Sequence, residues 1–182
     1  MNHVDHVALI RAGVEGAGPR WLELGAGDGA FTLALADIVG VGAEILASDR
    51  DERVLRSLTA RVQQVFPGRR LETRALDFTE AFPDGPFGGI LAANSLHFVR
   101  DRAATLRVIR EALAPDGRLV IVEYDTDEGN PWVPHPFSFE TWCREAVAAG
   151  FAEPRLLHRV PSRFLGAIYG AVTSVPNLAD GR

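Results

Sequence analysis

The stretch Trp21-Leu22-Glu23-Leu24-Gly25-Ala26-Gly27-Asp28-Gly29-Ala30-Phe31 begins with large apolar residues at alternating positions and then carries a glycine at every second position. The apolar part predicts a buried strand, the glycines predict a tight loop, and the residues from Ala30 onward predict a helix. Glycine tolerates positive φ and leaves room for a ligand against the backbone, because it has no Cβ atom. The stretch therefore predicts a strand–loop–helix unit that binds a nucleotide-like cofactor.

The charges around this loop indicate which kind of cofactor it binds. Glu23 precedes the glycines and Asp28 lies among them, whereas no lysine or arginine lies between Arg20 and Arg50. The spacing is G-x-G-x-G rather than the G-x-G-x-x-G of pyrophosphate-binding turns. Two carboxylates repel a phosphate and attract a cation. S-adenosylmethionine carries an ammonium and a sulfonium, so it suits this loop better than a dinucleotide does.

In these residues the chain resembles the class I S-adenosylmethionine-dependent methyltransferases, whose first motif has the form E/D-x-G-x-G-x-G. The resemblance implies that an acid and the loop backbone hold the amino-acid tail of the cofactor. The residues concerned are Glu23, Gly25, Ala26, Gly27 and Gly29. An ordinary glycine-rich turn between a strand and a helix is the structural alternative.

Two further acidic residues follow strand-like segments downstream. Asp49 lies 24 residues after Gly25, close to the interval of ~20 residues for an acid that binds ribose hydroxyls. The resemblance implies that Asp49 holds the ribose and that Arg50 flanks the adenine. It also implies that Asp77 and Phe78 bind the adenine edge. Each acid has a simpler alternative role, as the N-cap of a helix that follows it.

The segment from Gly89 to Val99 predicts a fourth strand that runs into a polar turn. The resemblance implies that Asn94 and Leu96 flank the methionine part of the cofactor. The chain departs from the family pattern just before this strand, where Gly88 and Gly89 stand in place of the usual aspartate.

His97, in the same turn, is a candidate catalytic residue. A histidine side chain titrates near neutral pH, which suits a general base that deprotonates a hydroxyl or a carbon acid. A histidine that only hydrogen-bonds the backbone at the strand end is the alternative. Tyr124, at the end of the next predicted strand, is a second catalytic candidate. His3, His6 and His135 are further candidates for the acceptor side, and for His3 and His6 the alternative is a solvated position near the N-terminus.

The rest of the chain predicts the other strands of an α/β fold. Residues 113–123 read L-x-P-x-G-R-L-V-I-V-E, a phrase that recurs in the family, and we expect a fifth strand over Arg118–Tyr124, after a helix that ends at residues 114–117. Residues 153–160 and 164–175 predict a closing hairpin. The resemblance implies a Rossmann-like, seven-stranded, mostly parallel sheet in the order 3-2-1-4-5-7-6, with strand 7 antiparallel and helices flanking the sheet.

The length of 182 residues suits a single domain. We expect this domain to consist of an N-terminal helix or lid (1–19), a cofactor-binding core (20–125), and an acceptor-side loop, helix and closing hairpin (126–182).

Composition limits the function classes. The net charge is −5 and the arginines are scattered, so we expect no nucleic acid as the main partner. No apolar run approaches the ~20 residues of a membrane span, and the N-terminus lacks the apolar core of a signal peptide, so we expect a cytoplasmic protein without membrane contact. The single cysteine, Cys143, fits that compartment.

Residue types also limit the chemistry. The chain has no lysine, which excludes a Schiff-base lysine and a Walker-type lysine. No set of histidine, cysteine and acidic residues has the spacing of metal ligands, so we expect no metal. A homodimer is one of the assemblies that the sequence leaves open.

We therefore expect a methyltransferase that moves the methyl group of S-adenosylmethionine to a small-molecule acceptor by direct in-line displacement, which alignment of the reactants promotes. Two other classes remain. One is an NAD(P)-dependent Rossmann oxidoreductase, which the G-x-G-x-G spacing, Glu23 and the antiparallel tail disfavour. The other is a non-catalytic S-adenosylmethionine-binding module or partner subunit, which an intact cofactor site without an acceptor pocket would favour.

Overall fold

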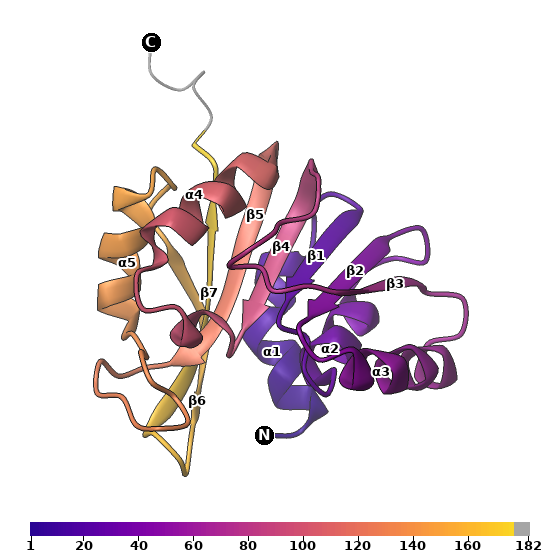
Figure 1. Cartoon of the computed structure of the whole chain (residues 1–182), viewed down its shortest axis with the longest axis horizontal. Coiled ribbons are helices and arrows are strands. Elements are labelled where there is room, and N and C mark those ends of the chain that lie inside the picture. Colours follow the sequence, from indigo (N-terminus) through magenta and orange to yellow (C-terminus); the bar gives the residue numbers. More distant parts are fainter. Residues whose placement is uncertain (177–182) are drawn as a thin grey trace.

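A mixed sheet of seven strands runs through the molecule in the order β3-β2-β1-β4-β5-β7-β6 (Figure 1). The computed structural model describes residues 1–176, so residues 177–182 of the expected acceptor-side part lie outside the described residues. The first five strands pair in parallel, and β7 runs antiparallel to both β5 and β6. The predicted strand order and the antiparallel seventh strand are confirmed. The strands are β1 (Arg20–Leu24), β2 (Glu44–Asp49), β3 (Arg70–Ala75), β4 (Phe87–Ala93), β5 (Leu113–Tyr124), β6 (Arg155–Pro161) and β7 (Ala167–Ser174).

Helices cover both faces of this sheet. Apolar side chains of α1, α2 and α3 pack on one face, and those of α4 and α5 pack on the other. Among the described residues, no helix is long and apolar enough to cross a membrane. The helices are α1 (His3–Val14), α2 (Ala30–Ile38), α3 (Glu52–Val65), the short 3-10 helix η1 (Leu96–Phe98), α4 (Arg102–Ala112) and α5 (Phe139–Ala148).

The central strands are buried on both faces, as is usual for parallel strands between two helix layers. In β4, for example, Ile90, Leu91 and Ala92 have no exposed surface. The outer strand β3 alternates between exposed and half-buried residues instead. Because the faces of the central strands are filled with apolar side chains, polar groups that serve a ligand lie at the strand ends.

Two glycines at the start of β4 explain the departure from the family pattern. A Cβ atom on Gly89 would lie 2.4 Å from the indole of Trp21, and one on Gly88 would lie 2.5 Å from the Cα of Gly18. Trp21 is buried in β1, directly opposite Gly89 in the pairing of the two strands. Neither position therefore has room for an aspartate side chain.

The start of β5 also differs from the prediction. Leu113 already pairs with Phe87 of β4, and the register then breaks before Arg118 pairs with Gly89. The Pro-Asp-Gly segment between them interrupts the pairing, because proline lacks an N–H group and glycine weakens a strand. The regular part of β5 begins at Arg118, as predicted.

Gly29 joins the glycine loop to α2, and its replacement should destabilise the fold. Its φ is +84°, and a Cβ atom there would lie 2.1 Å from Cδ1 of Leu58, which is fully buried in α3. We predict that Gly29→Ala lowers the free energy of unfolding by ~2–4 kcal/mol, because left-handed backbone strain and overpacking both act on the alanine. Urea unfolding measures this. Gly42→Ala is the control, since nothing lies within 4 Å of that position; equal losses in the two variants would contradict the prediction.

Candidate active site

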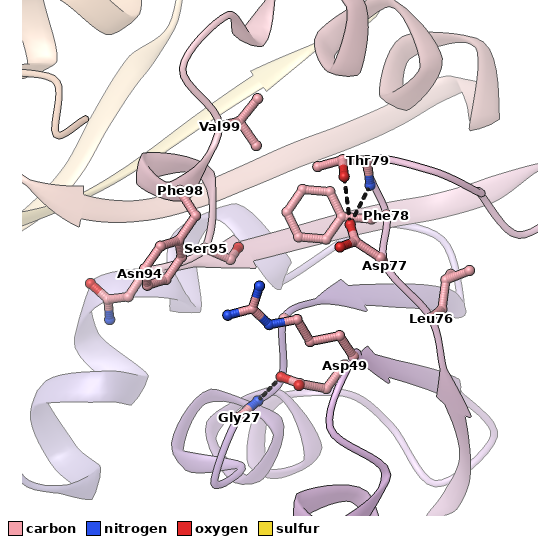
Figure 2. A pocket seen from close by; sticks show the side chains of 12 residues that line it. Gly27, Asp49, Leu76, Asp77, Phe78, Thr79, Asn94, Ser95, Phe98 and Val99 are labelled. Carbon is pink, nitrogen blue, oxygen red and sulfur yellow. Dashed lines mark hydrogen bonds between the residues drawn. The ribbon is translucent and has the colours of Figure 1, made fainter. Parts of the chain in front are cut away.

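A cavity of about 390 Å³ opens at the carboxyl ends of β1, β2, β3 and β4 (Figure 2). The strand order reverses between β1 and β4, and open α/β sheets bind their ligands at such a reversal. The volume lies in the range of small-molecule and cofactor sites. The wall consists of Gly25, Gly27, Asp49, Arg50, Leu76, Asp77, Phe78, Thr79, Asn94, Ser95, Phe98 and Val99.

The cavity brings together most of the residues that the sequence indicated for cofactor binding. Those in the wall are Gly25, Gly27, Asp49, Arg50, Asp77, Phe78 and Asn94. Four others lie outside the wall: Glu23, Ala26, Gly29 and Leu96. The Leu96 side chain is fully buried in the core beneath α4 and α5, so it does not flank a ligand in the cavity.

The two glycines in the wall serve different purposes. At Gly25 the backbone has a φ of +71°, and a Cβ atom would lie 2.7 Å from Cβ of Ser95. Gly25 therefore lets the loop pass close to the turn after β4. At Gly27 the φ is +54°, and nothing lies within 4 Å of the place of a Cβ atom. The backbone at Gly27 is thus open to a ligand.

Asp49 ties the end of β2 to the glycine loop. Its Oδ2 accepts a hydrogen bond from the N–H of Gly27 at 2.8 Å (Figure 2), and its Oδ1 accepts one from the N–H of Asp51 at 2.9 Å. The N-cap of α3 is Asp51, which accepts from the N–H of Arg53, so Asp49 does not have the alternative capping role. Each carboxylate oxygen keeps a further lone pair for a ligand.

Asp77 is held by its neighbour Thr79. The hydroxyl and the N–H of Thr79 donate to Oδ1 at 2.6 and 2.9 Å (Figure 2), and these bonds lower the pKa of Asp77 below its usual range. Oδ2 makes no hydrogen bond within residues 1–176. The carboxylate is therefore oriented and charged, with one oxygen left for a ligand.

His97 forms a buried pair with Glu123, a residue that the sequence did not single out. The Nδ1 atom of His97 lies 2.7 Å from Oε2 of Glu123, and both side chains are almost fully buried. Oε1 of Glu123 accepts hydrogen bonds from the N–H groups of Leu96 and His97, at 3.0 and 3.3 Å. Because a carboxylate only accepts, Nδ1 carries the proton and Nε2 keeps its lone pair. Nε2 has no hydrogen-bond partner within the described residues, and His97 itself is not part of the cavity wall.

Arg102 fixes the turn that carries His97. Its Nη1 donates to the carbonyl oxygens of Val99 and His135, both at 3.1 Å, and the N–H of His135 donates to the carbonyl of His97 at 3.0 Å. Its Nε and Nη2 donate to the two carboxylate oxygens of Glu145, at 2.7 Å each. Arg102 is thus a positioning residue that joins three segments around His97.

Tyr124 lies beside the same histidine, with its ring centre 6.2 Å from that of His97. Burial and the negative charge of Glu123 raise the pKa of Tyr124. Its hydroxyl therefore stays protonated at neutral pH and can donate a hydrogen bond, but it does not serve as a base.

The other histidines named from the sequence are placed differently. His3 pairs with Asp37 of α2 at 3.0 Å, on the surface of the helix layer and outside the cavity wall. The ring of His6 lies 4.8 Å from that of Phe31, and burial lowers its pKa. His135 contributes its backbone to the turn of His97. Within residues 1–176, no three histidine, cysteine or acidic side chains are grouped as metal ligands.

The family model for the methyltransferase domain matches residues 22–121, which is more than half of the chain. The chain belongs to the class I S-adenosylmethionine-dependent methyltransferases. This membership confirms the family that the glycine loop indicated, and with it the cofactor.

Individual methyltransferases resemble the chain over different lengths. The ubiquinone/menaquinone biosynthesis C-methyltransferase UbiE of Photorhabdus laumondii is 30% identical over 119 residues, which are 65% of this chain and 47% of that protein. The reducing polyketide synthase grgA of Penicillium sp is 28% identical over 156 residues, 73% of this chain and 6% of the synthase. The chain thus spans less than half of either relative. The glycopeptide N-methyltransferase MtfA, solved with S-adenosylmethionine, has the same fold, with a TM-score of 0.73 at 16% identity over 96% of this chain and 95% of that one.

The residues around the cavity fit the methyltransferase cofactor. Oδ1 of Asn94 and Oγ of Ser95 are buried and have no hydrogen-bond partner in the described part of the chain. Asn94 also has a φ of +52°, which few residues other than glycine adopt. Buried polar atoms in proteins normally have partners. The ammonium, hydroxyl and amino groups of S-adenosylmethionine are donors that can supply them.

The first acid of the methyltransferase motif, Glu23, is buried and lies outside the cavity wall. Its side chain is buried, and the hydroxyl of Thr32 in α2 donates to Oε2 at 2.5 Å. Burial raises its pKa to about 8. Near neutral pH the carboxyl group is therefore mostly protonated in this structure, which weakens the attraction to a cation that we expected from Glu23. A role of Glu23 in holding the cofactor stays a prediction. Asp28, the other acid of the loop, is exposed.

The raised pKa of Glu23 makes stability depend on pH. The Glu23 carboxyl group releases its proton near pH 4.5 in the unfolded chain and near pH 8 in the folded chain. Between these values only the folded chain holds the proton, so the free energy of unfolding falls as pH rises, by at most ~1.4 kcal/mol per pH unit. We predict that Glu23→Gln removes this fall. The difference in stability between the variant and wild type should therefore shift in favour of the variant when the pH is raised from 5.5 to 8. Urea midpoints at both values test it, with the exposed Glu72→Gln as control. Parallel pH curves for wild type and Glu23→Gln would refute the prediction.

Proposed function

We propose that this chain transfers the methyl group of S-adenosylmethionine to a small organic acceptor with a weakly acidic O–H or C–H group, and that His97 removes the acceptor's proton. The observation that carries this proposal is the 2.7 Å contact between Nδ1 of His97 and the buried carboxylate of Glu123. The same arrangement of a carboxylate, an imidazole and a free Nε2 activates nucleophiles in other enzymes. The C-methyltransferase activity in the name of the UbiE relative agrees with an acceptor that must lose a proton.

The cofactor roles follow from the cavity wall. Asp49 would accept hydrogen bonds from the ribose hydroxyls, and Asp77 with Phe78 would contact the adenine. The backbone at Gly27 and the orphaned Oδ1 of Asn94 would hold the amino-acid tail. When bound there, S-adenosylmethionine supplies an electrophilic methyl group, which the acceptor takes by in-line displacement. Support for these roles comes from the free acceptor atoms at the cavity wall.

In this proposal the residues on the acceptor side have different roles in the removal of the acceptor's proton. Glu123 keeps the proton of His97 on Nδ1 and compensates the positive charge that forms when Nε2 takes a proton. Arg102 holds the turn at a fixed place. Tyr124, which stays protonated, can donate a hydrogen bond to an acceptor oxygen. Alignment of the acceptor against the cofactor supplies much of the remaining rate enhancement.

Cofactor binding is the first test. We predict that S-adenosylhomocysteine at 100 times its Kd stabilises the protein by ~2.7 kcal/mol, because it binds only the folded state, and that NADH does not. Asp49→Ala should weaken binding by roughly 10- to 100-fold, since it loses hydrogen bonds to a charged group and frees the loop at Gly27. Asp51→Ala, which removes only the helix cap, is the control. Stabilisation by NADH alone would replace this reading with an oxidoreductase.

The role of His97 is the second test. We predict that His97→Gln keeps the affinity for S-adenosylhomocysteine and lowers turnover by roughly 10²–10⁴-fold, because a glutamine takes no proton. Release of S-adenosylhomocysteine reports turnover in a screen of phenols and β-dicarbonyl compounds. The wild-type rate should fall at acidic pH, where an imidazole is protonated.

Glu123→Gln separates catalysis from mere packing. It keeps the shape but removes the negative charge, so the acidic limb of the pH–rate profile should move to lower pH as turnover falls. Full turnover in His97→Gln with an unchanged pH profile would leave His97 a structural role. No turnover by wild type with any acceptor, despite cofactor binding, would favour the non-catalytic module.

A further inference from the structure

Exposed aromatic side chains gather at one place on this molecule. Among residues 1–176, the exposed phenylalanine and tryptophan side chains are Phe98, Trp132 and Phe164, at 57%, 72% and 50% of their surface. The Phe98 ring lies 4.4 Å from that of His97, and the Phe164 ring lies 5.9 Å from that of Tyr124. Clustered exposed apolar groups mark interaction sites, whereas scattered ones do not. This cluster reaches the candidate base through Phe98 on one side and through Tyr124 on the other.

Three of these rings form a continuous row, which we call the aromatic ledge: Tyr124, Phe164 and Trp132. Tyr124 and Phe164 meet at 5.9 Å with an angle of 60°, and Phe164 and Trp132 meet at 6.3 Å with an angle of 73°. The row begins 6.2 Å from the ring of His97. Its members come from the end of β5, the β6–β7 turn and the loop between β5 and α5, which lie at the same edge of the sheet (Figure 1).

Hydrogen bonds within the chain hold Trp132 where it is exposed. Oδ1 of Asn130 accepts from the N–H groups of Trp132 and Val133, both at 2.9 Å, and the N–H of Asn130 donates to the carbonyl of Val133. Asp127 in the same loop accepts from the N–H and the hydroxyl of Ser138, the N-cap of α5. The tryptophan thus stands on a closed turn that is tied to a helix.

The other end of the loop and the facing turn are also held. Asp125 accepts from the N–H of Phe139 at 2.9 Å and pairs with Nε of Arg159 in β6 at 2.8 Å. The N–H of Phe164 donates to Oγ of Ser162 at 3.2 Å. An ordered aromatic surface of this kind binds a partner at a lower entropic cost than a mobile one.

We infer that the aromatic ledge binds an acceptor with a flat aromatic ring system and holds its acidic hydroxyl toward Nε2 of His97. This inference rests on the proposed function for the position of the reacting group. Rings attract one another in offset and edge-to-face arrangements at 4.5–7 Å, and the ledge presents successive ring faces and edges at such spacings. A flexible acyl chain would gain no ring–ring attraction and would lose more rotamer entropy. A fused ring system also offers more ring surface to the row than a single ring does.

Binding of 2-naphthol and phenol to the full chain, with and without S-adenosylhomocysteine, tests the inference by calorimetry. We predict that 2-naphthol binds more tightly than phenol and that Trp132→Leu weakens 2-naphthol binding by about tenfold, because leucine keeps an apolar surface but has no ring. Trp132→Phe should keep most of the affinity. Phe164→Leu should weaken binding as Trp132→Leu does.

Val41→Ala is the control for surface apolarity. Val41 is 72% exposed, as Trp132 is, but it precedes β2 at the opposite edge of the sheet. Its replacement should leave 2-naphthol binding unchanged, and neither Trp132→Leu nor Phe164→Leu should change the affinity for S-adenosylhomocysteine.

Three results would overturn the inference. One is equal binding of 2-naphthol by wild type, Trp132→Leu and Phe164→Leu. Another is dependence on Trp132 for an acetoacetyl thioester but not for 2-naphthol, which would make an acyl chain the occupant. The third is a wild-type dimer that Trp132→Leu converts to a monomer, without 2-naphthol binding, which would make a second copy the occupant. Failure to bind S-adenosylhomocysteine would instead refute the proposed function. The binding of 2-naphthol by wild type and the variants would then be compared without cofactor, and it would still test the aromatic ledge.

Discussion

The carboxylate of Glu123 is the contact on which the arrangement of the site depends. It lies at the end of β5 without exposed surface, and it accepts two backbone N–H groups and the imidazole of the turn after β4. A buried carboxylate is stable only when such donors surround it. The turn must therefore close around Glu123, and that closure places Asn94 and Ser95 in the cavity wall while the buried His97 faces Glu123.

A second buried acid, Glu23, has fewer hydrogen-bond donors around its carboxyl group than Glu123 has. One strand end holds an acid surrounded by three N–H groups, and the other holds an acid with a single hydroxyl donor and a pKa of about 8. Burial disfavours the charged form of Glu23, and its single hydroxyl donor does not offset this effect. The two glutamates, both near the ends of parallel strands, thus have different roles. The carboxyl group of Glu23 packs mostly protonated under the glycine loop, and Glu123 orients the candidate base.

The sequence predicted the strand order and most of the cavity wall because these depend on local patterns. Gly25, Gly27, Asp49 and Asp77 lie at a strand end or within three residues of one, so their places follow from the strand ends. Contacts between segments that are distant in the sequence could not be predicted in the same way. The pair of His97 and Glu123 joins residues from two strand ends, and its sequence signal is one acid after four apolar residues of a buried strand. Arg102 gave no signal, because its partners come from the turn after β4, the loop before α5 and α5 itself.

The antiparallel β7 has a consequence for how the chain can vary. Because β7 runs antiparallel to β5, it starts at the carboxyl edge of the parallel strands, and the β6–β7 turn lies at that edge. As a result, the cavity wall is drawn from residues 25–99, whereas the aromatic ledge is drawn from residues 124–164. The match to the family model ends at residue 121, before the ledge begins. The segment that the family model matches therefore contains the cavity wall and leaves out the proposed aromatic ledge. An exchange of residues 122–176 between related chains would show whether acceptor choice can be moved onto an unaltered cofactor site.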